Sequence, residues 1–303
     1  MELRAEINPS GVEDTFLAGL NRSFGHWGDH TTYAWGFERE VGARAADLIV
    51  LRDEGMIVAG SAVSYRIVQQ HGDQIMVGVM TGSWTLPEAR GRGAFGQMIH
   101  ESRTLTAARG GSLLIAFVTH ENASRRRLVA EGCAEVPTWY VASDPDTSPP
   151  SRAASVEPSP AAAEELFRAH ADWQAGGSGA SVVYLSVEVW KSQFLVRPLP
   201  VEVVRAAGGR CVIERSATSD RVLWTDGRDG PAALAALLKR AIESGRQLFM
   251  FTMDPTLARV GADLGMMAKP GSLTILDAPD EGNERPKASR IPAAWRVQGG
   301  DRA

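Results

Sequence analysis

The chain has 303 residues, of which 44% are hydrophobic and 22% charged, a composition that indicates a globular protein with a core and excludes a disordered chain. One domain takes roughly 100–200 residues, so the length favours two domains. The net charge of -4 argues against nucleic-acid binding through bulk charge. Two cysteines exclude a disulfide framework and a cysteine metal cage. No signal peptide or membrane-length apolar run is evident, so we expect a cytoplasmic protein with no membrane partner.

The composition changes sharply at residues 143–160, a stretch rich in Pro and Ser that is typical of a linker. This stretch separates an expected first domain at 1–142 from a second at 161–278. A tail at 279–303 carries charge, Gly and Pro, with Trp295 among its few large apolar residues. We expect this tail to be disordered or to lie over the surface.

The first half alternates between strand and helix patterns. Ser10-Gly11-Val12-Glu13 has the form of a capping box and predicts the start of a helix. Three apolar runs with glycine turns between them predict antiparallel strands at 47–52, 56–69 and 74–86. The elements expected after them are a helix at 94–109, a strand at 112–118, a helix at 122–131 and a strand at 136–142. This order predicts an α+β fold.

The second half repeats the plan of the first. Ser159-Pro160 has the form of a helix start, with Ser as the N-cap and Pro in the first turn. The elements expected next are strands at 201–206, 210–215 and 221–225, a helix at 231–243, a strand at 247–252, a helix at 255–264 and a strand at 272–277. Residues 113–133 and 247–267 fall in register as strand, helix and closing glycine. Two tandem copies of one fold explain this match.

The segment between the strand at 74–86 and the following helix is rich in glycine. Gly91, Gly93 and Gly96 let the backbone approach a ligand closely. The free N–H groups of the first helical turn favour an anion. Arg90 and Arg92 add positive charge suited to phosphate. The segment therefore predicts a phosphate or pyrophosphate ligand, although it is no Walker loop because no Gly-Lys-Ser/Thr follows.

This segment resembles the pyrophosphate signature of the GNAT family of acyl-CoA-dependent N-acyltransferases, Arg/Gln-x-x-Gly-x-Gly/Ala. Arg90 and Gly93 match the signature, whereas Phe95 stands at its last place. The resemblance covers 20–142 well and 160–278 more faintly. It implies two tandem GNAT-like domains, each a mixed, mostly antiparallel twisted sheet flanked by helices, with acetyl-CoA or another acyl-CoA as co-substrate.

The resemblance also implies which residues hold the coenzyme. Backbone groups at the end of the strand would pair with the pantetheine arm, and the loop amides would hold the pyrophosphate. The residues implied are Trp84, Thr85, Leu86, Arg90, Gly91, Arg92, Gly93, Ala94, Phe95, Gly96, Asn122 and Arg125. Two simpler alternatives remain open, namely that Trp84 is a core residue and that Arg92 is solvated.

Direct attack of an amine on a thioester needs a base and an acid for the leaving thiolate. The family's usual acid is a Tyr, but its place in this chain holds Leu128. The candidate catalytic residues are therefore His120, Tyr140, His26 and Asp29. His26, Asp29 and His30 together could bind a metal, but such a loop is more often polar surface, so no metal is expected.

The second copy has Thr225-Asp226-Gly227-Arg228-Asp229-Gly230 in place of the glycine-rich loop. Asp226 and Asp229 would repel a pyrophosphate, so we expect the second domain to be degenerate. The resulting hypothesis is acetyl transfer from acetyl-CoA to a primary amine of a small molecule by a monomer or homodimer. The alternatives are a longer acyl-CoA or acyl-carrier-protein donor and a non-catalytic CoA-binding protein.

Overall fold

The computed structural model describes residues 3–41, 44–70, 72–177, 179–278 and 294–302. The chain divides into two compact units: the first comprises residues 1–135 and 273–292, and the second comprises 136–272 and 293–303. The division therefore falls a few residues before the expected boundary at 142. It also assigns all but the first residue of the strand predicted at 272–277 to the first unit.

The first unit is a sheet with helices on both faces. Its elements are β1 (Arg4–Ile7), α1 (Glu13–Phe24), α2 (His30–Tyr33), the π-helical turn η1 (Ala34–Glu38), β2 (Asp47–Asp53), β3 (Met56–Gln70), β4 (Asp73–Thr85), the 3-10 turn η2 (Pro87–Ala89), α3 (Ala94–Ala108), β5 (Leu113–Thr119) and α4 (Ala123–Ala130). Strands β1 to β4 are antiparallel in sequence order, and β5 lies parallel to β4. The predicted α+β order is confirmed.

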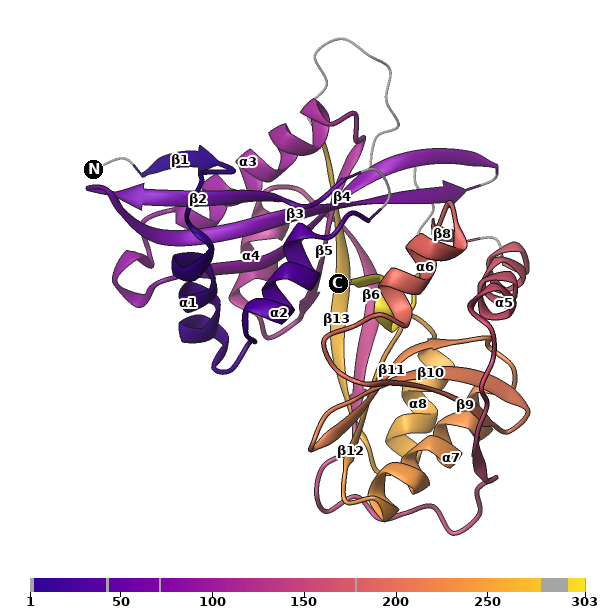
Figure 1. Ribbon diagram of the computed structural model, residues 1–303. Coiled ribbons are helices and arrows are strands. Elements are labelled where there is room, and N and C mark those ends of the chain that lie inside the picture. The colour runs from indigo at the N-terminus through magenta and orange to yellow at the C-terminus, as the bar shows by residue number, and fades with distance from the viewer. Residues whose placement is uncertain (1–2, 42–43, 71, 178, 279–293, 303) are drawn as a thin grey trace. The chain divides into compact units, whose positions relative to one another are not determined.

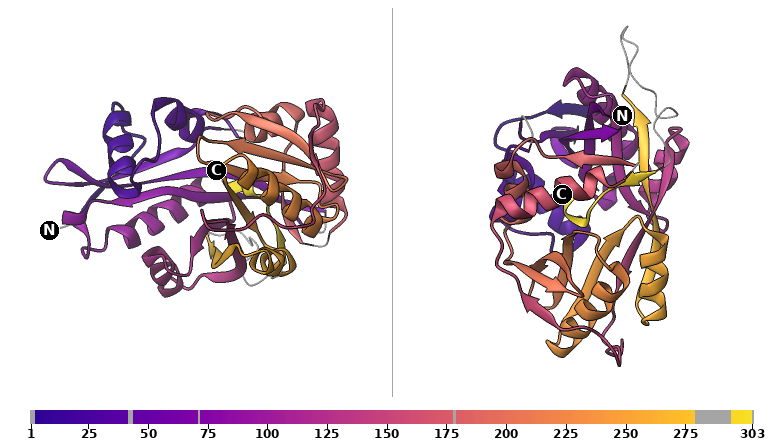
Figure 2. Two further views of the ribbon diagram at one scale, coloured as in Figure 1. Left: turned by 90° about the horizontal axis from the view of Figure 1, so that it is seen from below. Right: turned by 90° about the vertical axis from the view of Figure 1, so that its right-hand side faces the viewer.

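Alternation along the strands assigns each helix to one face of this sheet. In β2, Ile49 and Leu51 pack in a core cluster with α3 and α4, whereas Val50 packs with α1 and α2. α1 and α2 accordingly lie on one side of β2–β4, with α3 and α4 on the other (Figures 1 and 2). Both faces of the sheet are therefore buried.

β4 and β5 separate before β4 ends. Their parallel pairing stops at Val79 and Ile115, although β4 continues to its end beyond this pair. A β-bulge lies in the separated part, where Gly82 and Ser83 of β4 stand opposite Ser61 of β3. The far end of β4 thus has β3 on one side, and no pair with β5 is formed there among the described residues.

The second unit has the same plan. Its elements are β6 (Ala134–Ala142), β7 (Val156–Pro158), α5 (Ala163–Ala175), β8 (Ala180–Val183), α6 (Val187–Phe194), β9 (Val201–Ala206), β10 (Gly209–Arg215), β11 (Ser219–Thr225), α7 (Gly230–Glu243), β12 (Gln247–Thr252), α8 (Pro255–Asp263), β13 (Met267–Asp277) and β14 (Trp295–Arg296). Its main strand order is β6-β12-β11-β10-β9-β7, and β14 pairs with β8. β11 and β12 are parallel, as β4 and β5 are. β11 also carries a bulge near its end.

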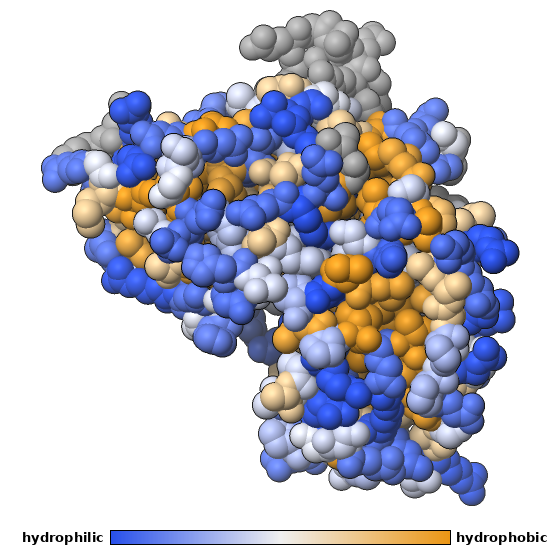
Figure 3. Space-filling model, viewed as in Figure 1, coloured by the Kyte–Doolittle hydropathy of each residue, from blue (hydrophilic) through white to orange (hydrophobic). Residues whose placement is uncertain are grey.

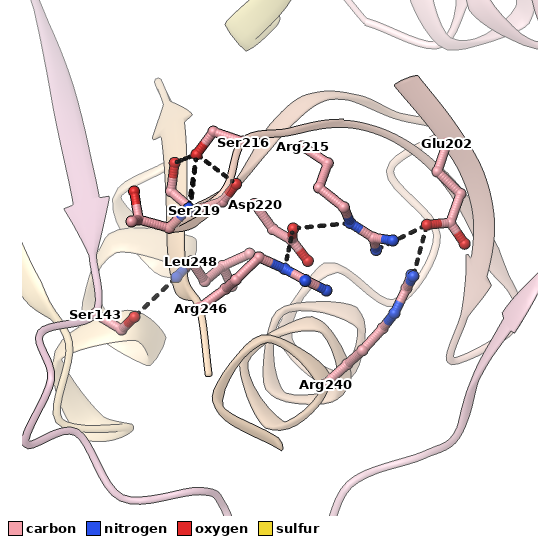
Figure 4. Close-up of polar contacts among 10 residues, drawn as sticks. Ser143, Glu202, Arg215, Ser216, Ser219, Asp220, Arg240, Arg246 and Leu248 are labelled. Carbon is pink, nitrogen blue, oxygen red and sulfur yellow. Dashed lines mark hydrogen bonds and ion pairs between the residues drawn. The ribbon is translucent and has the colours of Figure 1, made fainter. Parts of the chain in front are cut away.

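Ion pairs join the strands and α7 at the start of β11 (Figure 4). Arg215 and Arg246 both contact the buried Asp220, at 3.2 and 2.8 Å. Arg215 and Arg240 both contact Glu202, at 2.7 and 2.6 Å. Carboxylates therefore hold all three arginines near the start of β11, whereas Thr225 lies at its other end.

One strand of each unit comes from the other half of the chain. β6 follows α4 in sequence, yet residues 139–142 pair with β12 in the second unit. Residues 273–277 of β13 belong to the first unit. There, Thr274 Oγ1 donates to the carbonyl of Ala116 at 3.0 Å, and the N–H of Ala278 donates to the carbonyl of Ser112. The two repeats therefore exchange strands.

The two helix starts that were predicted from serine N-cap motifs, at Ser10 and Ser159, were misplaced. α1 begins at Glu13 with Val12 as its N-cap and no side-chain cap, because Gly11 at φ +68° turns the chain between Ser10 and the helix. α5 begins at Ala163, because the N–H of Ser159 still pairs with the carbonyl of Val203 beside β9. Neither predicted serine cap forms.

Part of the expected linker and part of the expected tail have structure. β7 lies within 143–160 and forms an edge strand, a position that tolerates Pro158. Residues 294–302 pack into the second unit, where Trp295 is 4% exposed. Among the exposed large apolar residues, Leu185 and Val196 flank α6, where the space-filling view shows apolar surface (Figure 3).

Candidate functional site

The glycine-rich loop after β4 forms the N-terminal end of α3. Gly91 and Gly93 have φ values of +77° and +82°, which other residues rarely adopt, and Gly93 is the N-cap of α3. A Cβ added at either glycine would meet no atom within 4 Å. The loop backbone is therefore uncovered at the end of a helix where N–H groups lack intrahelical partners and an anion is favoured.

A cavity of about 460 Å³ lies against this loop, within the size range of small-molecule and cofactor sites. It is lined by Ser23, Phe24, Ser83, Trp84, Thr85, Ala89, Arg90, Gly91, Gly93, Ala94, Phe95, Gly96, Ala123, Ser124 and Arg127. These residues come from the end of α1, the end of β4, the loop with the start of α3, and α4. The cavity thus lies at the end of β4 that extends beyond its pairing with β5.

Two buried polar atoms on residues lining this cavity have no hydrogen-bond partner among the described residues, Ser23 Oγ and Trp84 Nε1. A buried polar group without a partner costs roughly 1–3 kcal/mol. Trp84 Nε1 lies toward Gly60 of β3, where an added Cβ would come within 2.8 Å of it.

Arg127 lines the cavity, although Arg125 was the member of the arginine run 125–127 expected among the coenzyme-binding residues. Its guanidinium packs over the first turn of α3, where a Cβ on Gly96 would lie 2.6 Å from Arg127 Nη2. Gly96 is therefore needed for this approach. The signal available in the sequence was the run of three arginines. Both Arg125 and Arg127 bind a glutamate, Arg125 with Glu135 at 2.8 and 2.9 Å and Arg127 with Glu131 at 2.6 Å, and Arg127 is the one of the two that lines the cavity.

Arg92 and Asn122 also make structural contacts in place of lining the cavity. Arg92 binds both carboxylate oxygens of Asp53, at 2.5 and 3.1 Å. Asn122 is the N-cap of α4, and its Oδ1 accepts from the N–H of Ser124 at 2.9 Å. Arg90 is the predicted arginine that does line the cavity, and its Nε lies 3.4 Å from the carbonyl of Thr85.

At the end of β4, the expected residues divide between core and cavity. The N–H of Leu86 already donates to the carbonyl of Val58 at 2.9 Å. The Trp84 ring is 3% exposed and packs edge-on against Phe16, with a centroid distance of 5.7 Å. Trp84 is therefore both a core residue, as the simpler alternative held, and part of the cavity wall.

No protein-family model matches the sequence, and no curated protein matches it. Solved structures do match. A GCN5-related N-acetyltransferase from Anabaena variabilis ATCC 29413 superimposes with a TM-score of 0.63 at 12% identity, covering 91% of this chain and 73% of that one. A tandem GNAT protein from the clavulanic acid biosynthesis pathway gives 0.58 at 13%, covering 93% and 100%. A GCN5-related N-acetyltransferase from Kribbella flavida gives 0.59 at 13%, covering 90% and 70%.

The chain has the GNAT fold. The resemblance stated from the loop is thus confirmed for the fold, including two repeats. The identity to these and similar solved structures is 10–14%, so the likeness concerns the fold.

Within this GNAT fold, the histidine and aspartate candidates lie on exposed turns. Asp29 is the N-cap of α2, and its Oδ1 accepts from the N–H and the hydroxyl of Thr32, each at 2.9 Å. These hydrogen bonds lower the pKa of Asp29, which weakens it as a base. His26 and His120 are exposed, and none of the three lines the cavity.

Tyr140 belongs to the other GNAT repeat. It lies on β6 in the second unit, where its ring packs edge-on against Phe251 at 5.5 Å and Arg302 stacks over it at 4.6 Å. Burial raises the pKa of Tyr140. Leu128, at the place of the usual acid, is 1% exposed in the core of the first unit.

Within the described ranges, no three His, Cys, Asp or Glu residues come together as a metal site. In the same part of the chain, no helix is long and apolar enough to cross a membrane.

Proposed function

We propose that the chain is an acyl-CoA-dependent N-acyltransferase whose first unit binds the coenzyme. One observation carries this proposal: the end of β4, unpaired toward β5, leads into an uncovered helix N-terminus at a cavity. An extended arm with amide groups can pair with such a strand edge, and a pyrophosphate can bind the loop amides. Arg90 and Arg127 line the same cavity and would add charge for the phosphates.

The reaction we propose is direct transfer to an amine. The lone pair of a deprotonated primary amine attacks the thioester carbonyl carbon, the C–S bond breaks, and the coenzyme leaves as a thiolate. A thiol has a pKa near 8.5, so its thiolate leaves without a strong acid. The ionisable side chains in the described cavity lining are Arg90 and Arg127. Positioning of the two reactants would therefore supply most of the rate enhancement, with water removing the amine proton.

The walls of the cavity favour a short acyl group. Met80 and Met98, whose flexible side chains could accommodate a longer acyl chain, pack in the core cluster of the first unit, 6% and 0% exposed. Phe95 is a bulky side chain that lines the cavity along with Trp84 and Phe24. Acetyl-CoA is accordingly the donor we propose, with a small-molecule primary amine as acceptor.

Substitutions at Gly93 test the coenzyme site. Gly93→Glu and Gly93→Ala impose the same backbone strain at φ +82°, and both added side chains enter open space. Only Glu places a carboxylate where the pyrophosphate would bind, so we expect it to weaken acetyl-CoA binding by ~100-fold or more. Isothermal titration should show Gly93→Ala within ~10-fold of the parent protein. Equal affinity in Gly93→Glu and Gly93→Ala would show that the loop does not hold the coenzyme.

A non-catalytic coenzyme-binding protein is the second candidate, favoured by the buried Leu128 at the acid position. The two are separated by detecting free thiol while the protein is incubated with acetyl-CoA and a panel of primary amines. Amine-dependent thiol release that disappears in Gly93→Glu supports the transferase. Tight acetyl-CoA binding without release by any amine supports the second candidate.

A further inference from the structure

A second cavity lies wholly within the second unit. Its volume is about 570 Å³, and it sits at the end of β11 and the start of α7, the place that the cavity beside Gly93 has in the first unit. The charges that surround the two cavities differ. Arg90 and Arg127 line the first, whereas Asp226, Asp254 and Arg296 line the second.

The chain itself fills the part of this place where a coenzyme arm would lie. The pairing of β11 with β12 stops at Val222 and Met250. Beyond that pair, residues 298–299 lie against β11. A Cβ on Gly299 would lie 2.5 Å from the carbonyl oxygen of Val222, and Gln298 Nε2 donates to the carbonyl of Thr225 at 3.0 Å. The free strand edge that the first unit offers is therefore occupied here by the protein's own backbone.

The start of α7 is also a poor anion site compared with that of α3. Pro231 lies in its first turn and removes one N–H donor. The Asp226 carboxylate lies in the preceding loop, where it accepts from the N–H of Arg228 at 3.2 Å. A phosphate would meet this carboxylate directly.

The ion pair of the Asp226 carboxylate is a long one, with an exposed arginine. The Asp226 side chain is only 9% exposed, and its ion pair is with Arg228 Nε at 3.8 Å, on a side chain that is 78% exposed. Arg296 lines the same cavity, but its Nη1 donates to the carbonyls of Trp173 and Gln174 at the end of α5. The arginines at the start of β11 are bound to Glu202 and Asp220 (Figure 4).

Aromatic side chains form part of the wall. Trp173, Phe251 and Trp295 line the cavity, and two of these rings already hold a cation of the protein, with Arg296 over Trp173 at 4.2 Å and Arg302 over Phe251 at 4.6 Å. The indole N–H of Trp295 is buried and has no hydrogen-bond partner among the described residues. A ligand that also carries an oxygen acceptor would satisfy this donor.

We propose that this cavity is a second binding site, for a small organic cation that carries a protonated amine and an oxygen acceptor. Asp226 would pair with the ammonium group, with Asp254 adding negative charge, and the tryptophans would enclose the carbon skeleton. The site goes beyond the proposed transfer reaction and does not depend on coenzyme binding in the first unit.

The test is titration calorimetry with matched probes: ethanolamine against ethylene glycol, putrescine against butanediol, and glucosamine against glucose and glucuronate. We expect at least one amine to bind ten times or more tightly than its neutral analogue, with glucuronate weaker than glucose. No preference for the amine in any pair, or tighter binding of glucuronate, would overturn the proposal.

Substitutions then assign binding to the cavity. Asp226→Asn should weaken binding of the preferred amine at least tenfold. Asp229→Asn is the matched control, because Asp229 lies in the same loop but does not line the cavity, and Asn tolerates its positive φ of 42°. If Asp226→Asn fails to fold, Asp254→Asn takes its place, since Asn also caps a helix.

The coenzyme-deficient Gly93→Glu protein separates this site from the proposed transfer reaction. The amine should bind it with unchanged affinity. Loss of amine binding in Gly93→Glu, or equal affinities in Asp226→Asn and Asp229→Asn, would place the amine elsewhere and contradict the second site.

Discussion

At the residue scale, two glycines fix the position of Trp84 in the cavity wall. A Cβ on Gly19 of α1 would lie 2.4 Å from Trp84 Cζ2, and a Cβ on Gly60 of β3 would lie 2.8 Å from Trp84 Nε1. Neither glycine has a positive φ, so the requirement is space for the indole and not backbone freedom. Neighbours without side chains thus hold a large residue at the end of β4.

Gly19→Ala is expected to destabilise the protein by about 1–3 kcal/mol, because overpacking a core costs more than alanine gains in a helix. The usual effect of replacing a helix glycine by alanine is therefore reversed. The check is a double-mutant cycle in urea with Trp84→Leu, which removes the clashing ring. A cost of Gly19→Ala that is as large in the Trp84→Leu protein as in the parent would show that the indole is not the cause.

The sequence was informative where one local pattern decides the structure. The glycines of the loop after β4 predicted the turn, the helix start and the open face, all of which the backbone bears out. It was less informative for charged side chains, since nothing local tells whether Arg92 meets a ligand or Asp53, which is distant in the sequence. Arg125 and Arg127 differ only in the partners that the fold brings to them.

At the element scale, α5 and α6 are held on the second sheet by an aromatic cluster around one histidine. His170 is 1% exposed, and its ring lies within 6.4 Å of five aromatic rings. These are Trp173, Tyr184, Trp190, Phe194 and Trp224. Burial lowers the pKa of His170 from 6.5 to about 4, so the ring is neutral at pH 7.

Acid should therefore weaken the second unit before its carboxylates titrate. Neutral His170 contributes its full share to the free energy of unfolding above pH 6.5. As the pH falls from 6.5 toward 4, the unfolded chain binds a proton at this histidine before the folded protein does, so that share is lost. One group of this kind changes the stability by about 3 kcal/mol over that range. Urea midpoints at pH 7.5, 6 and 5 measure this loss.

His170→Leu should have a flatter pH dependence of the urea midpoint than the parent protein. His100→Gln is the matched control, since His100 is an exposed histidine on α3 in the first unit. If the slope of the parent persists in His170→Leu, the pH dependence arises from another group.

At the scale of the whole molecule, the strand exchange decides which parts of the chain can stand alone. Composition predicted a boundary after residue 142, because the proline-rich stretch begins there. Strand pairing crosses that boundary, with 136–142 in the second unit and 273–277 in the first. No local pattern reveals this, since β6 and β13 occupy equivalent places in the two repeats.

A fragment of residues 1–142 should therefore not unfold cooperatively, because β5 lacks the strand that covers it. A chimera that joins residues 1–132 to 266–278 restores this strand after α4 and should unfold in one transition. Circular dichroism during urea titration distinguishes the two. Cooperative unfolding of the 1–142 fragment at the stability of the chimera would show that residues 273–277 are dispensable for the first unit.

The strand exchange also affects how the protein is made. Synthesis at about 5–20 residues per second puts roughly 7–30 s between the emergence of β6 and of residues 273–277. During that interval β5 has an open edge, which is a template for pairing with another chain. On the ribosome, the first half must therefore wait for the second, and nascent chains close together on one messenger RNA are the partners most able to pair wrongly with it.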